Sequence, residues 1–267
     1  MATKEDLIRV FEDTERLCRE NERLRQAVAA SIAGTRFCAE GETPALPSPR
    51  YDETVVSVGK YRSFETAMFY HRKYPEARIA VHNFASATNP GGGARKGSRA
   101  QEEALCRCST LFFALETEEN RRRFYEFHRQ RHDTRYTDAC LYTPGIVVCK
   151  SDDDMPSLLP EAKWLTVDVL TCAAPNLRHI ALRDEEIAAI HERRGRHLLA
   201  IAAASGADIV ILGAFGCGAF QNPPAIVAGA YQKILPEFRG QFREVAFAVY
   251  CPPRDQRNYE TFRRVLQ

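Results

Sequence analysis

The chain has 267 residues, of which 45% are hydrophobic and 27% are charged, and its formal net charge is +2. This composition is ordinary for a globular protein with one sizeable core. The nearly balanced charge does not favour a nucleic-acid binder, so we expect no nucleic acid as partner. Residues 1–18 mix acidic with basic side chains and contain no apolar run, unlike a secretory signal. No stretch reaches the roughly 18 apolar residues of a membrane helix, so we expect no membrane association.

The nine cysteines are an odd number scattered along the chain. Cys149, Cys172 and Cys251 lie in apolar runs, where cysteine behaves as a small buried hydrophobe. We therefore expect reduced thiols and a cytoplasmic location. Cys106 and Cys108 form a C-x-C pair, but no second pair follows at zinc-site spacing. The sequence predicts neither a metal nor another cofactor.

The first fifty residues differ from the rest. Residues 4–33 show apolar side chains at a helical period, which predicts one or two amphipathic helices. Three prolines at positions 44, 47 and 49 then mark a boundary. We expect a helical extension with a proline-rich linker over 1–50 and a catalytic domain over 51–267.

From residue 54 onward, short apolar runs alternate with helical stretches. The expected strands cover 54–58, 78–84, 145–149, 164–170, 207–215 and 244–250, and the expected helices cover 63–74, 99–115, 184–205 and 224–235. The run ADIVILGAF has almost no polar alternation, as in a strand covered on both faces. This order predicts an α/β sandwich with a mixed sheet.

A glycine-rich loop follows the strand expected at 78–84. Gly91, Gly92 and Gly93 permit positive φ and let backbone N–H groups approach an anion or a sugar, although glycines also occur in flexible surface loops. Seven residues later come Gln101, Glu102 and Glu103, at the start of a predicted helix. Acidic residues oppose the helix dipole there. Beside a bound ribose, such a carboxylate could also assist glycosidic cleavage.

A second unusual loop, GAFGCGAF at 213–220, follows the buried strand. Gly216 and Gly218 leave the backbone free to wrap a diphosphate, and Phe220 offers a flat face to a sugar or base. The lysine and hydroxyl of a Walker motif are missing. A tight turn with a core phenylalanine is the simpler alternative.

Together these blocks resemble a known family. NFASATNPGGG, seven residues, QEE, then VDVLTCAAPN and LGAFGCGAFQNPP resemble the bacterial-type poly(ADP-ribose) glycohydrolases of the macrodomain superfamily, from about residue 50 to the end. The resemblance implies a macrodomain-like α/β/α sandwich. It also implies hydrolysis of ribose–ribose bonds in poly(ADP-ribose) or of ADP-ribosylated proteins, with ADP-ribose as product. Compact bacterial members suggest attack at chain ends.

The same resemblance assigns residues. Glu103 would be the catalytic acid/base, and Glu102 and Asn89 would hold ribose hydroxyls. The backbone of 91–93 would line the distal ribose and diphosphate. The remaining ADP-ribose contacts would come from Gln101, from Asn83, Phe84, Ala85 and Asn176 on the nucleotide side, and from Gly216, Cys217, Gly218, Ala219 and Phe220 around the diphosphate.

Three other interpretations stay open at this point. A macrodomain can bind ADP-ribose without cutting it, but such a reader has no need of two carboxylates in the QEE element. Removal of a single ADP-ribose from an acceptor is another enzymatic possibility. The arginine-rich segment 121–135 could bind nucleic acid or the polymer, although a solvated helix face is the simpler reading. The sequence does not determine the oligomeric state.

Overall fold

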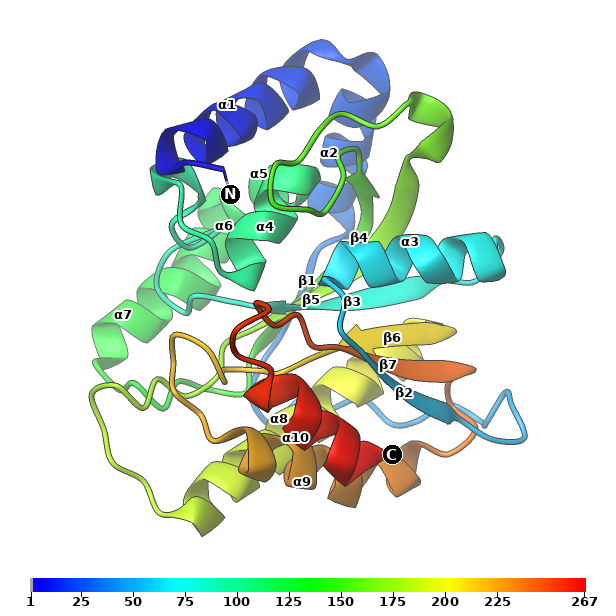
Figure 1. Ribbon diagram of the computed structural model, residues 1–267, viewed down its shortest axis with the longest axis vertical. Helices are drawn as coiled ribbons and strands as arrows, with labels where there is room; N and C mark the ends of the chain where they lie inside the picture. The colour runs from blue at the N-terminus through cyan, green and yellow to red at the C-terminus, as the bar shows by residue number, and fades with distance from the viewer. Residues whose placement is uncertain (1) are drawn as a thin grey trace.

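The structure, a computed structural model, describes residues 2–267 and builds one mixed sheet between two layers of helices (Figure 1). Within these residues, seven strands pair in the order β1-β4-β5-β3-β6-β7-β2. Strand β4 is antiparallel to both of its neighbours, and the other pairs are parallel. The strands are β1 Arg36–Cys38, β2 Val55–Gly59, β3 Ile79–Phe84, β4 Cys140–Val148, β5 Leu165–Cys172, β6 Ile209–Leu212 and β7 Glu244–Ala248. The predicted α/β fold with a mixed sheet is confirmed.

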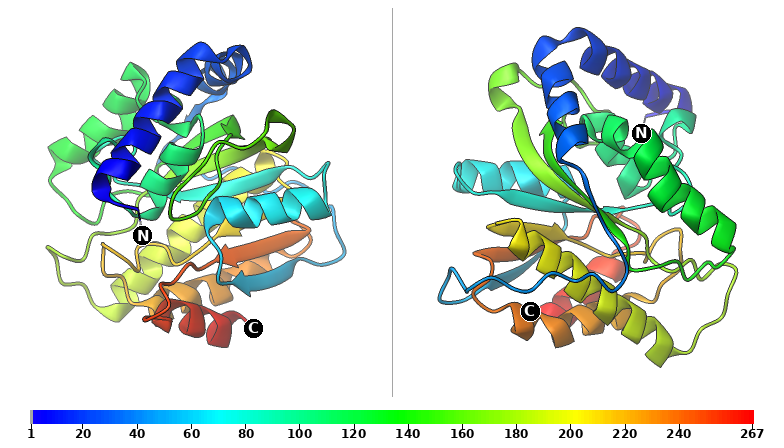
Figure 2. Two further views of the ribbon diagram at one scale, coloured as in Figure 1. Left: turned by 45° about the horizontal axis from the view of Figure 1, so that its top comes forward. Right: turned by 180° about the vertical axis from the view of Figure 1, so that it is seen from behind.

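Helices cover both faces of this sheet (Figures 1 and 2). One layer contains α3, α4 and α5, and the other contains α8, α9 and α10. The helices are α1 Lys4–Glu20, α2 Glu22–Gly34, α3 Ser63–Lys73, α4 Gln101–Cys108, α5 Leu111–Leu115, α6 Glu118–Asn120, α7 Phe127–Arg131, α8 Asp184–Ala204, α9 Pro224–Ile234 and α10 Arg257–Leu266, with a π-helical turn at Arg121–Glu126 before α7. The sequence did not predict α10, whose ten residues bury only Phe262.

The alternation of side chains along β3 shows why two layers are needed. Ile79 and Val81 join the core beneath α3 to α5, whereas Ala80 joins the core beneath α8 and α9. Successive strand residues point to opposite faces, so a strand that is apolar throughout must be covered twice. The same reasoning applies to β6, whose four residues are all buried.

The amino-terminal extension forms two helices that pack on the sheet domain. Asn21 ends α1, and its side chain accepts a hydrogen bond from the Leu24 N–H at 3.1 Å, so the same residue caps α2. Phe11 of α1 is buried in the core that also contains Phe64 of α3. The extension therefore shares a core with the rest of the chain. The division into an extension with a linker over 1–50 and a catalytic domain over 51–267 stays a prediction.

Two elements differ most from their predicted bounds. The strand expected at 145–149 begins five residues earlier, because Pro144 and Gly145 sit at a break in the β4–β5 register and do not end the strand. Gly145 has a φ of +71°, which glycine adopts freely. The single helix expected over 99–115 is divided at Ser109 into α4 and α5.

The helices and the cysteines of residues 2–267 bear on membrane insertion and on disulfide formation. In this part of the chain, no helix is long and apolar enough to cross a membrane. All nine cysteines carry free thiols. Burial raises the pKa of most of these thiols, for example that of Cys149 to about 11, so they resemble small core residues more than nucleophiles.

Two helical glycines test how closely α8 and α9 cross. A Cβ on Gly195 of α8 would lie 2.4 Å from Ile234 Cδ1, whereas a Cβ on Gly229 of α9 would meet nothing within 4 Å. We expect Gly229→Ala to raise Tm by a few degrees, since alanine is favoured over glycine by about 1 kcal/mol in a helix. Gly195→Ala should lower Tm, because the buried side chains of Ile234 and Tyr231 must shift to admit the Cβ. Equal stabilisation of both variants in thermal melts would contradict this packing.

Candidate active site

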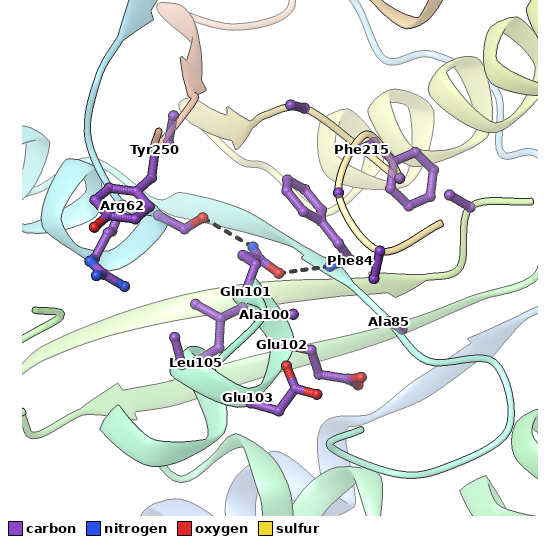
Figure 3. A pocket seen from close by; sticks show the side chains of 18 of the residues that line it. Arg62, Phe84, Ala85, Ala100, Gln101, Glu102, Glu103, Leu105, Phe215 and Tyr250 are labelled. Atoms are coloured by element: carbon purple, nitrogen blue, oxygen red, sulfur yellow. Dashed lines mark hydrogen bonds between the residues drawn. The ribbon is translucent and has the colours of Figure 1, made fainter. Parts of the chain in front are cut away.

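A cavity of about 350 Å³ opens at the edge of the sheet where β3, β6 and β7 end. These strands are parallel within the sheet, so the loops that leave their carboxyl ends meet at one place. The start of α4 and the segment 214–220 form much of its wall (Figure 3). Of the predicted site residues, the lining includes Phe84, Ala85, Gln101, Glu102, Glu103, Gly216, Gly218, Ala219 and Phe220.

Glu102 is buried with both carboxyl oxygens in use. Its Oε2 accepts a hydrogen bond from the Ser86 N–H at 2.7 Å, and its Oε1 accepts one from Asn83 Nδ2 at 3.3 Å. Burial raises the pKa of Glu102 to about 8, and the neighbouring Glu103 adds to the rise, although both hydrogen bonds favour the ionised form. At neutral pH, burial therefore favours the protonated form of Glu102.

Glu103 differs from its neighbour in its hydrogen bonds. Its Oε1 accepts a hydrogen bond from the Gly93 N–H at 2.9 Å, while its Oε2 is buried and has no partner among residues 2–267. A buried oxygen without a partner is unfavourable unless a proton, a water or a ligand pairs with it. Of the two glutamates, only Glu103 has a carboxyl oxygen without a protein partner in the part of the chain that the structure describes.

The glycine loop packs against these carboxylates. Gly91 and Gly92 have φ values of +65° and +58°, as the sequence predicts, while Gly93 does not adopt positive φ. A Cβ on Gly92 would lie 2.5 Å from Glu103 Oε1 and 3.0 Å from Glu102 Oε2. None of the three glycines is among the cavity-lining residues, so their direct contact in this structure is with protein.

Gln101 connects three parts of the scaffold (Figure 3). Its Oε1 accepts a hydrogen bond from the Phe84 N–H at 2.9 Å, and its Nε2 donates to the His82 carbonyl at 2.7 Å and to Ser63 Oγ at 3.0 Å. The amide is therefore engaged at both ends. Its role here is to fix α4 against β3 and the start of α3.

The loop after β6 presents unpaired backbone donors. The N–H groups of Gly216, Gly218, Ala219 and Phe220 donate to no protein acceptor among residues 2–267. Gly216 has a φ of +75°, whereas Gly218 does not adopt positive φ and a Cβ there would meet nothing within 4 Å. Of the two glycines that the sequence expects to free this backbone, only Gly216 adopts positive φ. Clustered free N–H groups suit an anion such as a diphosphate.

Asn222 holds this loop in shape. Its side-chain amide donates to the carbonyls of Pro175, Gly216 and Phe220 at 2.8, 3.2 and 3.3 Å. Its Oδ1 contacts His191 Nε2 at 2.8 Å. Burial lowers the pKa of His191 to about 4, so the ring is neutral and its Nε2–H can donate to Asn222.

Comparisons with known proteins agree with this arrangement. The family "Microbial-type PARG, catalytic domain" matches residues 5–151. The crystal structure of poly(ADP-ribose) glycohydrolase from Thermomonospora curvata is 31% identical and covers 98% of this chain and 99% of its own, with a TM-score of 0.88. The complex of that enzyme with the inhibitor ADP-HPD has a TM-score of 0.84, at 31% identity and coverages of 97% and 99%. The Deinococcus radiodurans enzyme in complex with ADP-ribose is 33% identical, with coverages of 90% and 96% and a TM-score of 0.76.

The chain belongs to the microbial-type poly(ADP-ribose) glycohydrolase family. A search of curated proteins gave no match. The family membership confirms the predicted class of enzyme, a glycosidase, and the predicted fold. The matched residues begin in α1, so the helical extension lies within the segment that the family shares.

Several predicted site residues of this family member lie outside the cavity lining. Asn83 is buried behind Glu102, to which it donates a hydrogen bond. Asn89 is exposed, and its amide donates to Thr88 Oγ1 at 3.1 Å. Asn176 Oδ1 accepts a hydrogen bond from the Arg178 N–H at 3.3 Å, and Cys217 is also absent from the lining. Direct ADP-ribose contacts by these four residues stay predictions.

Other residues line the cavity although the sequence analysis missed them. Arg62 follows β2, Tyr250 follows β7, and Asn258 lies on α10. The guanidinium of Arg62 lies 4.0 Å from the centroid of the Tyr250 ring. The rule that ligands bind at strand ends could have identified Arg62 and Tyr250. Ser63, Arg99 and Asp152 also line the cavity and were not singled out from the sequence.

The arginine-rich segment is largely neutralised by acids. Arg121 pairs with Glu116, Arg123 with Glu119, Arg129 with Glu126 and Arg135 with Asp133, at 2.8 to 3.6 Å. This supports a solvated helix face over a nucleic-acid site. Within residues 2–267, no group of three or more His, Cys, Asp or Glu side chains is arranged to hold a metal ion.

The raised pKa of Glu102 predicts how stability depends on pH. An unfolded glutamate ionises near pH 4.5, whereas folded Glu102 keeps its proton up to about pH 8, so the folded state loses stability as pH rises between these values. Glu102→Gln removes this pH-dependent loss of stability, because glutamine does not ionise. From pH 5 to 8, we expect the Tm of the variant to fall a few degrees less than that of the wild type. Glu5→Gln, on the exposed part of α1, should match the wild type; an identical decline in all three proteins would contradict a protonated Glu102.

Proposed function

We propose that this chain hydrolyses the ribose–ribose glycosidic bonds of poly(ADP-ribose) and releases ADP-ribose, with Glu103 as the group that transfers the proton. The observation that carries the assignment is the difference between the two glutamates. Both oxygens of Glu102 accept hydrogen bonds from the protein, whereas Glu103 has one held oxygen and one without a partner beside the cavity.

The reaction needs two proton transfers, and one carboxyl group can perform both. As the bond between the anomeric carbon and the leaving ribose oxygen breaks, Glu103 donates a proton to that oxygen and becomes a carboxylate. The anomeric carbon gains oxocarbenium character. A water molecule then adds to this carbon and returns a proton to Glu103. The products are a free ribose hydroxyl on each side of the broken bond.

Glu102 would orient the sugar. Because it carries a proton at neutral pH, it can donate a hydrogen bond to a ribose hydroxyl as well as accept one. Phe220 would pack on the distal ribose, since its ring is partly exposed in the cavity wall. These two contacts would hold the anomeric carbon next to Glu103.

The diphosphate would lie on the loop 216–220. Uncharged N–H donors suit a doubly charged group beside carboxyl side chains, because they add no counter-charge that would itself need burial. The Deinococcus relatives were solved with ADP-ribose, which supports this ligand for the present cavity. Phe84 and Ala85 would form the neighbouring wall.

The base would occupy the part of the cavity near Tyr250, which Figure 3 shows on the other side of Gln101 from Phe215. Tyr250 is 46% exposed and offers an aromatic face, already flanked by Arg62. Stacking on such a face is a common way to hold a base. This placement adds residues to the nucleotide side that the sequence did not reveal.

Three finer points belong to the same proposal. We place the enzyme in the cytoplasm, supported by its nine free thiols. We place cleavage at chain ends, supported by analogy with compact bacterial members. We propose that the polymer is a better substrate than singly modified acceptors, supported by the family match.

One assay separates the candidate activities. The protein is incubated with automodified poly(ADP-ribose) and, separately, with singly ADP-ribosylated acceptors, and the products are identified by mass. We expect ADP-ribose from the polymer. Long oligomers would indicate internal cleavage, release only from singly modified acceptors would indicate the alternative hydrolase, and binding without products would indicate a reader.

Glu103→Gln should abolish polymer cleavage while ADP-ribose still binds. The amide keeps the shape and can accept the Gly93 hydrogen bond, but it cannot transfer a proton. A loss of roughly a thousandfold in kcat is expected when acid–base transfer and orientation act together. Turnover is measured by release of ADP-ribose and binding by calorimetry, with Glu5→Gln as the control. Near-normal turnover in a folded Glu103→Gln protein would refute the assignment.

Gly218→Val should weaken ADP-ribose binding without harming the fold. A Cβ at this position meets nothing within 4 Å in the unliganded protein, so the folded state has room for it. Bound phosphate oxygens would fill that space if the loop holds the diphosphate. We expect binding to weaken by about 2 kcal/mol, the scale of lost hydrogen bonds to a charged group. Unchanged affinity by calorimetry, with an unchanged melting curve, would show that the loop is only a turn.

A further inference from the structure

Arg107 and the amino-terminal helix α1 are connected to Glu103 by a continuous set of hydrogen bonds. We propose that Arg107, supported by Thr14 of α1, is a positioning residue for Glu103. This inference rests on the proposed role of Glu103 as the proton-transferring group. Helix α1, which the sequence predicts as part of an extension, would then support the position of Glu103.

The first links lie in the loop that holds Glu103. The Gly93 N–H donates to Glu103 Oε1 at 2.9 Å. The carbonyl of Gly93 accepts hydrogen bonds from the Lys96 and Ser98 N–H groups at 2.9 and 3.1 Å. The carbonyl of Ser98 in turn accepts a hydrogen bond from Arg107 Nη1 at 2.6 Å. Arg107 therefore closes the loop whose N–H fixes the carboxylate.

Arg107 is an unusual residue to bury for structure alone. It is 3% exposed, its Nε has no hydrogen-bond partner, and its guanidinium forms no ion pair among residues 2–267. It follows Glu103 by four residues on α4, which places both side chains on one face of the helix. Burial lowers the pKa of Arg107, and nearby negative groups, Glu103 among them, oppose that shift. A buried cation without an ion pair is costly, which is typical of functional sites.

Helix α1 supports the far end of this arrangement. Thr14 is 2% exposed, and its Oγ1 donates to the Arg107 carbonyl at 2.6 Å. This carbonyl belongs to the last turn of α4, where carbonyls lack partners within the helix. Thr14 therefore fixes the backbone from which the Arg107 side chain extends.

The same helix also touches the glycine loop. Glu15 forms an ion pair with Arg95 at 2.9 Å, and Arg95 lies two residues after Gly93. The rings of Phe11 and Phe112 meet edge to face at 5.0 Å, and a Cβ on Gly91 would lie 2.6 Å from Phe112. These contacts from α1 and α5 thus limit how the loop 91–98 can move.

Such support matters because the loop contains glycines that do not restrict the backbone by themselves. Displacement of a reacting group by about 1 Å, caused by a distant change, can reduce rate a hundredfold. Side chains that contact substrate elsewhere in the cavity should not depend on this network. The prediction is therefore a fall in kcat with little change in affinity for ADP-ribose.

The first test compares Thr14→Val with Thr14→Ser. Valine has the shape of threonine without the hydroxyl, and serine keeps the hydroxyl. We expect Thr14→Val to lower kcat on poly(ADP-ribose) about five- to tenfold, with the Kd for ADP-ribose within twofold of the wild type, and Thr14→Ser to restore kcat. Thr54→Val is the control, because the Thr54 hydroxyl donates to the Phe238 and Phe242 carbonyls and Thr54 does not line the cavity.

The second test changes Arg107 itself. Arg107→Gln should lower kcat about a hundredfold while the Kd for ADP-ribose stays within about threefold. Arg107→Lys, which keeps the cation and one donor, should recover part of kcat. If Arg107→Gln does not fold, the Arg107→Lys protein and the Thr14 pair decide the question.

The proposal is overturned if folded Thr14→Val and Arg107→Lys proteins both keep kcat within twofold of the wild type. It is also overturned if Thr14→Val and Thr54→Val lose equal stability, measured as Tm, and show the same fall in kcat. In that case, the Thr14 contact serves only the stability of the fold. The Glu103→Gln result separates failure of the positioning network from failure of the proposed role of Glu103. An inactive Glu103→Gln protein with normal positioning variants refutes only the network, whereas an active Glu103→Gln protein refutes the proposed role of Glu103.

Discussion

Two adjacent carboxyl groups are buried at the start of α4, and much of the surrounding structure follows from that constraint. A buried carboxyl group needs hydrogen-bond donors, a proton or both. Glu102 obtains donors from Ser86 and Asn83 and keeps its proton, and Glu103 obtains one donor from Gly93. These donors come from β3 and the loop after it, so that loop must approach α4 very closely. Gly92 is glycine because no Cβ fits there beside the carboxylates.

This constraint changes the meaning of the motif that the sequence analysis noticed first. The three glycines were expected to line the distal ribose and the diphosphate. In the structure, the position that a Cβ would take faces Phe112 at Gly91, both glutamates at Gly92 and Ser98 at Gly93, and backbone contacts of these glycines with ribose and diphosphate stay a prediction. The spacing of GGG and QEE is informative because the loop must return to the helix that it serves. Absence of a side chain signals close approach, but it does not say what approaches.

The order of strands and helices could be predicted because strongly apolar runs such as ADIVILGAF have one physical solution, burial on both faces. The glutamates and the loop 216–220 could be placed because each follows a strand end within one local segment. Arg62 and Tyr250 each follow a strand, so the strand-end rule makes each a candidate, but their contact with one another depends on the pairing of β2 with β7, which no local pattern encodes. The first half of β4 was missed because Pro144 and Gly145 read as a turn, whereas in the sheet they form a break in register.

Amide side chains show another limit of sequence reasoning. Gln101 and Asn222 lie in or beside the site segments, yet each serves the protein backbone. An amide carries donors and an acceptor, so it can join carbonyl and N–H groups from different elements. A carboxylate only accepts hydrogen bonds. Near loops, an amide is therefore suited to bridging backbone groups, whereas a carboxyl group is suited to proton transfer. The position of a residue in the sequence does not show which of these two roles it has.

The charge balance of the cavity connects these observations. A diphosphate brings negative charge close to two glutamates, and repulsion between such groups is strong where water is excluded. Burial favours the neutral form of Glu102, which lessens this repulsion, and the buried guanidinium of Arg107 lies on the same helix face as Glu103. With the carboxylates partly neutralised, backbone N–H groups of the 216–220 loop can hold the diphosphate without a lysine or arginine of their own. A fixed cation at that loop would attract the carboxylates as well as the ligand, whereas neutral dipoles with fixed geometry favour the ligand that matches them.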